Sequence, residues 1–190
     1  SLARNRDLYE FIVNVSGGNV RVAVELVSRY LGSPNVESER IVQTVTETGS
    51  YVVPLHEFAK AALLGDYSHF QEESSAATNV FSVVYRDRRE HFLSLLILGF
   101  LSWEGATRAQ ADGFISLDST ISEMQSGGFS PEQVSAHIQK LTRRKLIESS
   151  ERRLLETGQE IVESGLPELF RITTLGAYHL KRWVSEFSYL

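Results

Sequence analysis

The chain has 190 residues, of which 42% are hydrophobic, and its formal net charge is −5. This length suits one large domain or two small ones, and the hydrophobic content excludes a disordered chain. The absence of cysteine excludes disulfides and thiolate metal sites and favours a reducing, cytoplasmic location. No apolar run is long enough to span a bilayer and no signal peptide is evident, so we expect no membrane partner.

Residues 5–31 have the spacing of two helices joined by a glycine turn. The apolar stripe of the first helix consists of Leu8, Phe11, Ile12 and Val15. The second helix is largely apolar and is expected to end at Gly32, because Pro34 follows as a stop signal.

The turn between these helices reads Ser16-Gly17-Gly18-Asn19-Val20-Arg21. This motif, followed by an apolar helix, resembles the lid subdomain of AAA+ and related STAND-type ATPases of the origin-recognition type. The resemblance implies that Arg21 is a nucleotide-sensing residue, since a fixed guanidinium can stabilise charge on a transferring phosphoryl group. The alternative is a simple helix–helix turn with Arg21 as a solvated side chain of the first turn.

The nucleotide-binding parts of such an ATPase do not occur in this sequence. There is no G-x-x-x-x-G-K-[ST] phosphate loop, and no hydrophobic strand ends in paired acidic residues. We therefore expect no catalytic site, no metal site and no cofactor in the chain, and a stand-alone enzyme is the least favoured interpretation. The first residue is Ser, so we expect a fragment of a larger protein, with ATP bound to a domain upstream.

The middle of the chain is predicted to hold two more helices and a loop. Residues 36–50 have helical spacing, and an extended piece at 51–54 leads into a helix at 55–64. Residues 66–80 are rich in acidic and serine residues, which indicates a solvated loop and not a metal site. The predicted domains are a lid-like helical subdomain at 1–64, a linker at 65–86 and a second domain at 87–190.

The second domain is predicted to begin with an amphipathic helix at 88–103. Its apolar positions are dense enough to be mostly buried: Phe92, Leu93, Leu95, Leu96, Leu98 and Leu101. The next expected elements are a loop at 105–113, a strand at 114–116, a helix at 117–124 capped by Ser116 or Asp118, and a turn with Gly127 and Gly128.

A third helix begins at Ser130 with strong local signals. Ser130 is an N-cap candidate, Pro131 fits the first helical position, and Gln133 completes a capping-box pattern. The apolar stripe that follows is Val134, Ile138 and Leu141, and His137 is expected beside it as a packed or partly exposed residue. Two helices, a glycine turn and a capped amphipathic helix form the helix-turn-helix pattern.

After the third helix, strands at 146–149 and 170–173 are predicted to flank a long polar tip, and a final helix follows. The motifs K-L-x-x-R-x-L-I-E-S, from Lys140, and F-R-I-T-T-L-G-A-Y-H-L, from Phe170, resemble many prokaryotic winged-helix proteins. The expected fold is therefore mainly α with a small β-wing: a helical N-terminal subdomain plus a winged helix-turn-helix domain.

The third helix and the base of the wing carry the candidate DNA-binding residues. Ser135 and Gln139 are expected to face base edges. The phosphate-contacting candidates are Lys140, Arg143, Arg144, Arg152 and Arg153. The alternative is a solvated helix face whose cations complement the helix dipole, and the acidic net charge argues mildly against DNA.

Two functions follow from these patterns. The first is a non-catalytic C-terminal module of a larger ATPase, whose winged helix binds duplex DNA. The second is a protein-interaction or oligomerisation module without DNA binding, such as a homodimer through the C-terminal helix. The aromatic residues of that helix favour the second: Tyr178, Trp183, Phe187 and Tyr189.

Overall fold

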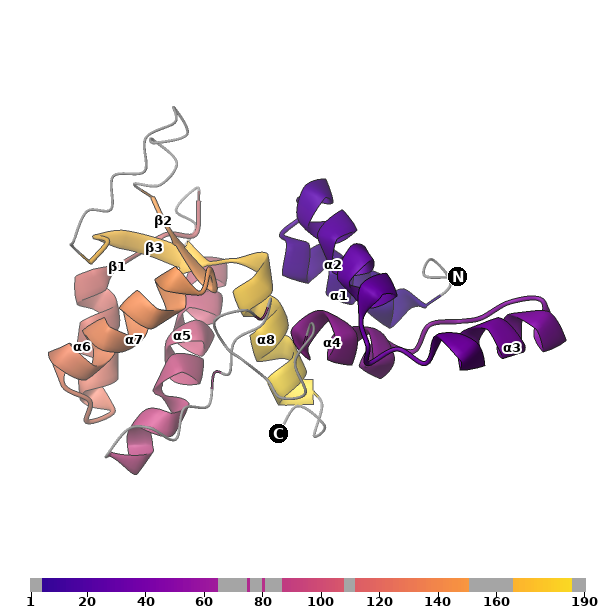
Figure 1. The fold of residues 1–190 in the computed structure, drawn as a ribbon. Helices are drawn as coiled ribbons and strands as arrows, with labels where there is room; N and C mark the ends of the chain where they lie inside the picture. Colours follow the sequence, from indigo (N-terminus) through magenta and orange to yellow (C-terminus); the bar gives the residue numbers. More distant parts are fainter. Residues whose placement is uncertain are drawn as a thin grey trace. The chain divides into compact units, whose positions relative to one another are not determined.

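The computed structural model shows a mainly helical chain with a small three-stranded antiparallel sheet near the C-terminus (Figure 1). The structure describes residues 5–64, 75, 80, 87–107, 112–150 and 166–185, and this part contains eight α-helices. The mainly helical class with a small β-element is confirmed. None of the helices in these ranges is long and apolar enough to cross a membrane.

The chain divides into two compact units, Ser1–Thr78 and Asn79–Leu190. Unit 1 contains α1 (Arg6–Ser16), α2 (Val20–Gly32), α3 (Ser38–Thr48) and α4 (Leu55–Leu64), which confirms all four predicted helices. Helices α1, α2 and α4 pack on one another around Phe58, which is fully buried. The Phe58 ring is stacked on Tyr30 at a centroid distance of 5.1 Å and meets Phe11 edge-on at 6.1 Å.

The predicted glycine turn between α1 and α2 is confirmed. Gly17 and Gly18 have φ angles of 60° and 77°, a left-handed region in which glycine carries no Cβ penalty. Asn19 then caps α2, because its side-chain oxygen accepts hydrogen bonds from the backbone amides of Arg21 and Val22. The turn therefore reverses the chain and starts α2 directly.

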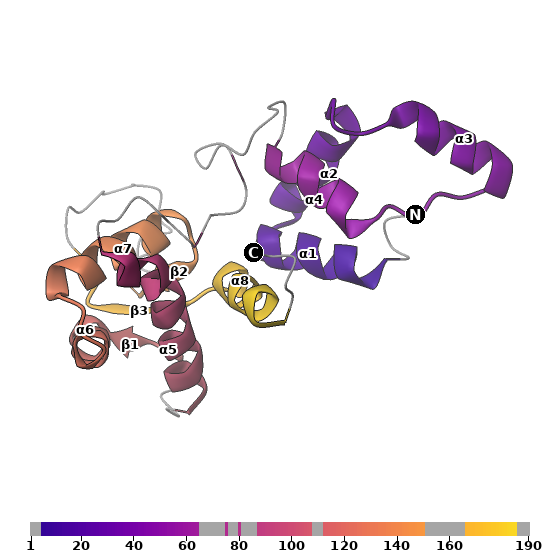
Figure 2. The ribbon, with the colours of Figure 1, turned by 90° about the horizontal axis from the view of Figure 1, so that it is seen from below.

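Helix α3 lies apart from the other three helices of unit 1 (Figures 1 and 2) and has no buried residue. Polar contacts at Glu57 of α4 connect it to the rest of the unit. The Tyr30 and Tyr51 hydroxyls each donate to a different Glu57 oxygen at 2.6 Å, and Arg40 Nη2 of α3 lies 3.5 Å from Oε2. Burial and the Glu57 carboxylate together raise the pKa of Tyr30 well above its usual range.

Unit 2 is built on a long central helix. Its elements are η2 (Arg88–Phe92), α5 (Leu93–Thr107), β1 (Ile115–Ser116), α6 (Leu117–Ser126), α7 (Pro131–Arg143), β2 (Ile147–Ser149), β3 (Leu169–Ile172) and α8 (Thr174–Ser185). The strand order is β1-β3-β2, and Phe170 in the middle strand is paired with both Ile115 and Ser149. Helix α5 contacts α7, α8 and β3, so its inner side forms the core.

The first helix of unit 2 differs from its prediction in three ways. It begins as a short 3₁₀ helix, because the Asp87 side chain accepts from the Arg89 amide and tightens the first turn. It also runs on to Thr107, into the expected loop. Gly105 therefore lies within the helix and does not end it. Gly113 packs closely against it, since a Cβ added to Gly105 would lie 3.2 Å from the Gly113 carbonyl oxygen.

The third difference is that α5 is apolar on both faces and not amphipathic. Leu93, Leu95, Leu98 and Leu101 are buried as expected. Phe92 and Leu96, also expected to be mostly buried, are 49% and 47% exposed, and Trp103 is 71% exposed. The reason is that large apolar side chains occupy every side of this helix, while unit 2 covers only one side.

Candidate nucleic-acid interface

Helix α7 begins with the predicted capping box. The Ser130 hydroxyl oxygen accepts from the Gln133 amide at 3.3 Å, and Gln133 Oε1 accepts from the Ser130 amide at 2.8 Å. Pro131 occupies the first helical position, where its missing N–H costs nothing. These local interactions fix where α7 starts and therefore which residues its faces present.

The inner face of α7 is buried and contains a histidine. Val134, Ile138 and Leu141 are at most 1% exposed, as the apolar stripe predicted. His137 is also 1% exposed, so it lies within the stripe and not beside it. Its Nδ1 lies 2.9 Å from the Ser94 hydroxyl of α5, and its Nε2 lies 3.7 Å from Glu90 Oε2.

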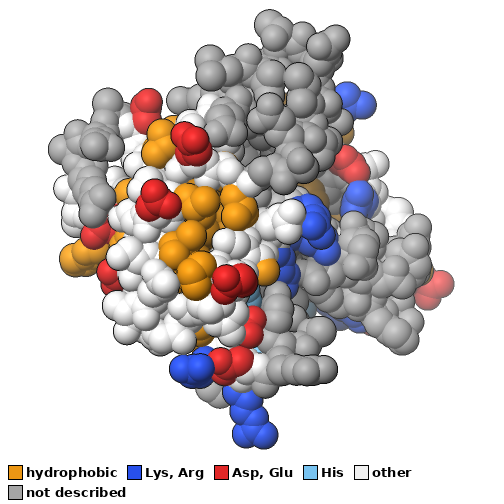
Figure 3. Space-filling view, turned by 90° about the vertical axis from the view of Figure 1, so that its left-hand side faces the viewer, with side chains coloured by type: hydrophobic (Ala, Val, Ile, Leu, Met, Phe, Trp, Pro, Cys, Tyr) orange, Lys and Arg blue, Asp and Glu red, His pale blue; other side chains and the backbone are white. Residues whose placement is uncertain are grey.

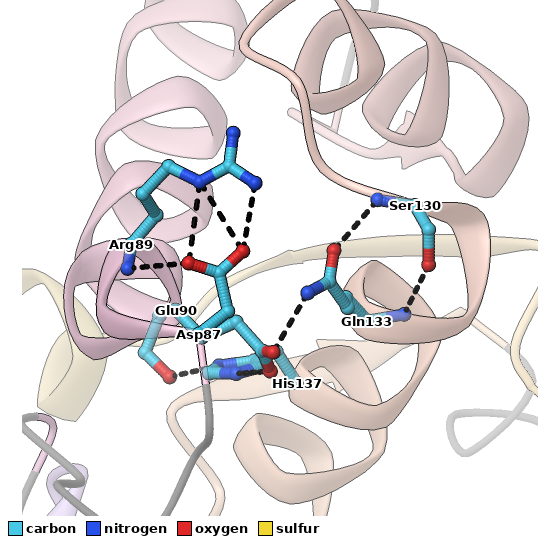
Figure 4. A network of polar contacts seen from close by, with 7 residues as sticks. Asp87, Arg89, Glu90, Ser130, Gln133 and His137 are labelled. Atoms are coloured by element: carbon cyan, nitrogen blue, oxygen red, sulfur yellow. Dashed lines mark hydrogen bonds and ion pairs between the residues drawn. The ribbon is translucent and has the colours of Figure 1, made fainter.

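One carboxylate, Glu90 of η2, contacts two residues on successive turns of α7 (Figure 4). Glu90 Oε1 accepts from Gln133 Nε2 at 2.7 Å, and Oε2 faces His137. Burial lowers the pKa of His137 below its ordinary value, although the Glu90 charge opposes this shift. At neutral pH the imidazole is therefore uncharged.

The carboxylate of Glu90, the imidazole of His137 and the hydroxyl of Ser94 are arranged in the order of a catalytic triad, but their burial excludes nucleophilic catalysis. Both Ser94 and His137 are 1% exposed, so a substrate has no access to the hydroxyl. The contacts instead join η2, α5 and the first half of α7. Their chemical consequence is positional: they hold α7 in one orientation on unit 2.

The outer face of α7 is formed by four exposed residues at helical spacing: Glu132, Ala136, Gln139 and Arg143. Among the predicted base-facing residues, Gln139 is therefore exposed, whereas Ser135 is half-buried.

The cations gather at the C-terminal end of α7. Lys140 is half-buried, Arg143 is exposed, and Arg144 follows as the half-buried C-cap. The predicted Arg152 and Arg153 lie outside the described residues, so the structure brings together only part of the predicted set. Lys145 belongs to the same run of cations in the sequence, although it was not among the predicted phosphate-contacting residues; it is exposed and has a φ of 59°.

Sequence reasoning missed Glu132 as part of the outer face. Its spacing of seven residues from Gln139 could have placed it there. The hydrogen bond from the Ser130 hydroxyl lowers the pKa of the Glu132 carboxyl, so this side chain is charged at neutral pH. Helix α7 thus carries a negative charge at its start and positive charges at its end.

The strand pair beside α7 contains an arginine that is already engaged. Arg171 of β3 pairs with Glu148 of β2 at 2.5 Å and donates to the Asp112 carbonyl oxygen at 2.9 Å. Its guanidinium also lies 4.8 Å from the centre of the Phe114 ring. Arg171 therefore fastens the sheet to the segment before β1.

In unit 1, Arg21 lies on the first turn of α2 and is exposed. Its backbone amide is used by the Asn19 cap at 2.9 Å. Its side chain makes no hydrogen bond or ion pair with the rest of the described chain. The guanidinium is thus exposed to solvent on the described surface of this unit.

No protein family, curated protein or solved structure is significantly similar to this chain. Within the ranges that the structure describes, no three His, Asp or Glu side chains come together as metal ligands. The predicted loop at 66–80 lies outside those ranges except for Ser75 and Val80.

Proposed function

We propose that unit 2 is a winged helix-turn-helix domain that binds duplex DNA through α7. The element order supports the fold: α6 and α7 are joined by a glycine turn, and the antiparallel pair β2 and β3 follows α7. In helix-turn-helix proteins the second helix of the motif enters the major groove and the first crosses the backbone. Helix α7 occupies that second position here.

The observation that carries the proposal is that the Arg143 and Lys145 side chains are exposed and unpaired within the described residues. Neither side chain makes a hydrogen bond or ion pair there. Four other described arginines, unlike Arg21, are paired with carboxylates: Arg29 with Glu25, Arg40 with Glu57, Arg89 with Asp87 and Arg171 with Glu148. Cationic side chains without a protein partner, placed at the end of a helix that fits the major groove, can bind DNA phosphate oxygens.

The test is fluorescence anisotropy of a labelled duplex titrated with the protein. We expect affinity to fall roughly 40- to 150-fold between about 50 and 200 mM salt, because three or four phosphate contacts release their counterions. The double variant Lys140→Glu with Arg143→Glu should abolish binding. The matched control, Arg21→Glu with Lys60→Glu, makes the same charge change at two exposed positions of unit 1 and should bind at low salt. If the wild-type protein does not bind the duplex at low salt, the proposal is wrong.

The proposal extends to unit 1 as the lid-like part of a larger, origin-recognition-type ATPase, with Arg21 as its nucleotide sensor. The exposed, unengaged guanidinium supports this role, and so does an apolar row on α2. Val20, Val24 and Leu31 in this row are 75%, 63% and 72% exposed, which suits packing against another domain. A phosphate-loop motif encoded upstream of residue 1 would support this role. An upstream sequence without that motif would reduce Arg21 to a surface arginine.

A second candidate function is protein interaction through α5. Leu96 and Trp103 are exposed on one face of this helix, and Phe92, the last residue of η2, is exposed directly before it. A separate group of apolar side chains, with Asp and Glu around it, lies on the side that faces the viewer in Figure 3, which is the side of α6 in Figure 1. The C-terminal helix gives this candidate less support: Tyr178 is buried, and the Trp183 side chain, Phe187 and Tyr189 lie outside the described part.

Light scattering with size exclusion tests this second candidate. A homodimer through α5 would dissociate in Trp103→Glu, whereas a monomeric wild type would exclude self-association by this face. Binding of DNA by Trp103→Glu with unchanged affinity would show that the two surfaces act separately.

A further inference from the structure

The DNA surface of unit 2 has the side chains of a backbone binder and not of a sequence reader. We infer that it takes duplex DNA of any sequence, holding phosphates with the C-terminal end of α7. This inference rests on the proposed function and names its substrate class. It follows from which polar atoms on α7 are free to reach a base edge.

Two polar side chains at the start of α7, those of Ser130 and Gln133, are already occupied (Figure 4), and Ser135 is half-buried. In helix-turn-helix proteins, the N-terminal residues of the second helix contact base edges. Here Gln133 Oε1 accepts a hydrogen bond from the Ser130 amide, and Gln133 Nε2 donates one to Glu90 Oε1. The Ser130 oxygen accepts from the Gln133 amide. Sequence readout needs free donors and acceptors, which these two residues do not offer.

The exposed row of α7 offers little more. Glu132 is charged and has acceptors only, so it repels phosphates and suits only a donor such as the cytosine amino group. Ala136 has no polar group on its side chain. Gln139 is the one exposed, uncharged polar side chain in this row of α7. A single glutamine in the second half of the helix does not specify a site.

The charges of the surface favour contact at the other end of the helix. Lys140, Arg143, Arg144 and Lys145 fall within six successive residues at the junction of α7 and β2. Arginine can pair with guanine, but the base-contacting positions of a recognition helix are at its N-terminal end, and Arg143 is the last residue of α7. At this end, long cationic side chains bind phosphates, and phosphate contacts fix position without reading bases. Because Glu132 lies at the opposite end of α7, the duplex is held most strongly at this junction.

The experiment is a competition assay together with selection from a random duplex library. Unlabelled A·T-only, G·C-only and mixed duplexes should displace a labelled probe within about 10-fold of one another, whereas specific sites typically exceed non-specific DNA by roughly 1,000-fold or more. Selection should enrich no motif. The slope of log affinity against log salt should be about −3 to −4, near −0.9 for each of the four described cations.

Matched variants sharpen the assay. Gln139→Ala should leave the relative affinities of the three competitor duplexes unchanged. Arg143→Gln and Lys145→Asn should weaken binding to all of them by the same factor, and Asn tolerates the positive φ at position 145.

Each outcome decides a different claim. An enriched motif, or a change of preference in Gln139→Ala, would overturn the inference while leaving DNA binding intact. Absence of binding to any duplex at low salt would overturn the proposed function itself and the inference with it.

Discussion

Gln133 Nε2 donates to Glu90 Oε1 at 2.7 Å, across 43 residues of chain. The same glutamine closes the capping box at the start of α7, so a single side chain joins that helix end to η2. The adjacent Arg89 is paired with Asp87, and its Nη1 would lie 3.2 Å from a Cβ at Gly128, in the α6–α7 turn. Segment η2 therefore holds both the turn and the first half of α7.

Removing the Glu90 carboxylate should destabilise unit 2. Glu90→Ala leaves the half-buried Gln133 amide and the buried His137 ring without this carboxylate, which costs about 1–3 kcal/mol of unfolding free energy. Glu90→Gln retains an acceptor and should lose less. Urea unfolding followed by circular dichroism measures both variants. Equal stability of Glu90→Ala and wild type would show that this contact carries no net energy.

Acid should destabilise unit 2 through His137. The pKa of this imidazole is lowered in the folded state by burial, so the unfolded chain binds more protons at mildly acidic pH. The stabilisation is therefore complete above the ordinary pKa of about 6.5 and is lost as pH falls toward the folded value. The charged groups that shift this imidazole's pKa are Glu90, which opposes the lowering, and Lys140, which adds to it.

Urea midpoints of wild type and His137→Asn at about pH 7.5 and about pH 5.5 test this linkage. Wild type should lose more stability across this interval than the variant does. The comparison of two pH values cancels the fixed cost of the substitution. An equal loss in both proteins would remove His137 as the source.

The local elements of the fold could be predicted from the sequence, because their signals are local. The Ser130–Gln133 capping box, the Gly17–Gly18 turn and the Ser116 cap all lie within four residues of the helix end that they fix. The exposed face of α5 could not be predicted, since Phe92 and Leu96 differ from their buried neighbours only in what unit 2 places beside them.

The candidate site could be predicted only in part, for the same physical reason. Gln139 and Arg143 follow from helical spacing within α7. The occupation of Gln133 by Glu90, and of Arg171 by Glu148 and Asp112, depends on residues distant in the sequence. Those contacts decide which polar groups remain free, and helical spacing within α7 does not reveal them.

Gly176 in α8 should tolerate no side chain. A Cβ there would overlap the carbonyl oxygen of Leu146 and lie 2.9 Å from Ile172 Cγ1. Gly176→Ala should therefore cost about 1–3 kcal/mol or more of unfolding free energy. Gly99→Ala is the matched control, because no atom lies within 4 Å of its Cβ position in α5. The control should be stabilised by up to about 1 kcal/mol, because Ala is the better helix former. Thermal unfolding of the two variants gives the comparison.

Glu57 should hold α3 on unit 1. Glu57→Ala removes the acceptor for the Tyr30 and Tyr51 hydroxyls and the partner of Arg40, at a cost of about 1–3 kcal/mol. Amide hydrogen exchange in α3 should then accelerate more than exchange in α1. Glu47→Ala breaks only an exposed contact with Gln43 and should change stability by less than about 0.5 kcal/mol. Unchanged protection of α3 in Glu57→Ala would contradict this role.

The most direct test of the central claim is an NMR titration of the ¹⁵N-labelled protein with a short duplex, followed by amide chemical shifts. We expect the amides of residues 139–145, at the end of α7, to shift first and to return to their free positions as salt is raised. The amides of α3 in unit 1 should stay unchanged. Shifts centred on the exposed face of α5, or the absence of any shift at low salt, would contradict DNA binding by α7.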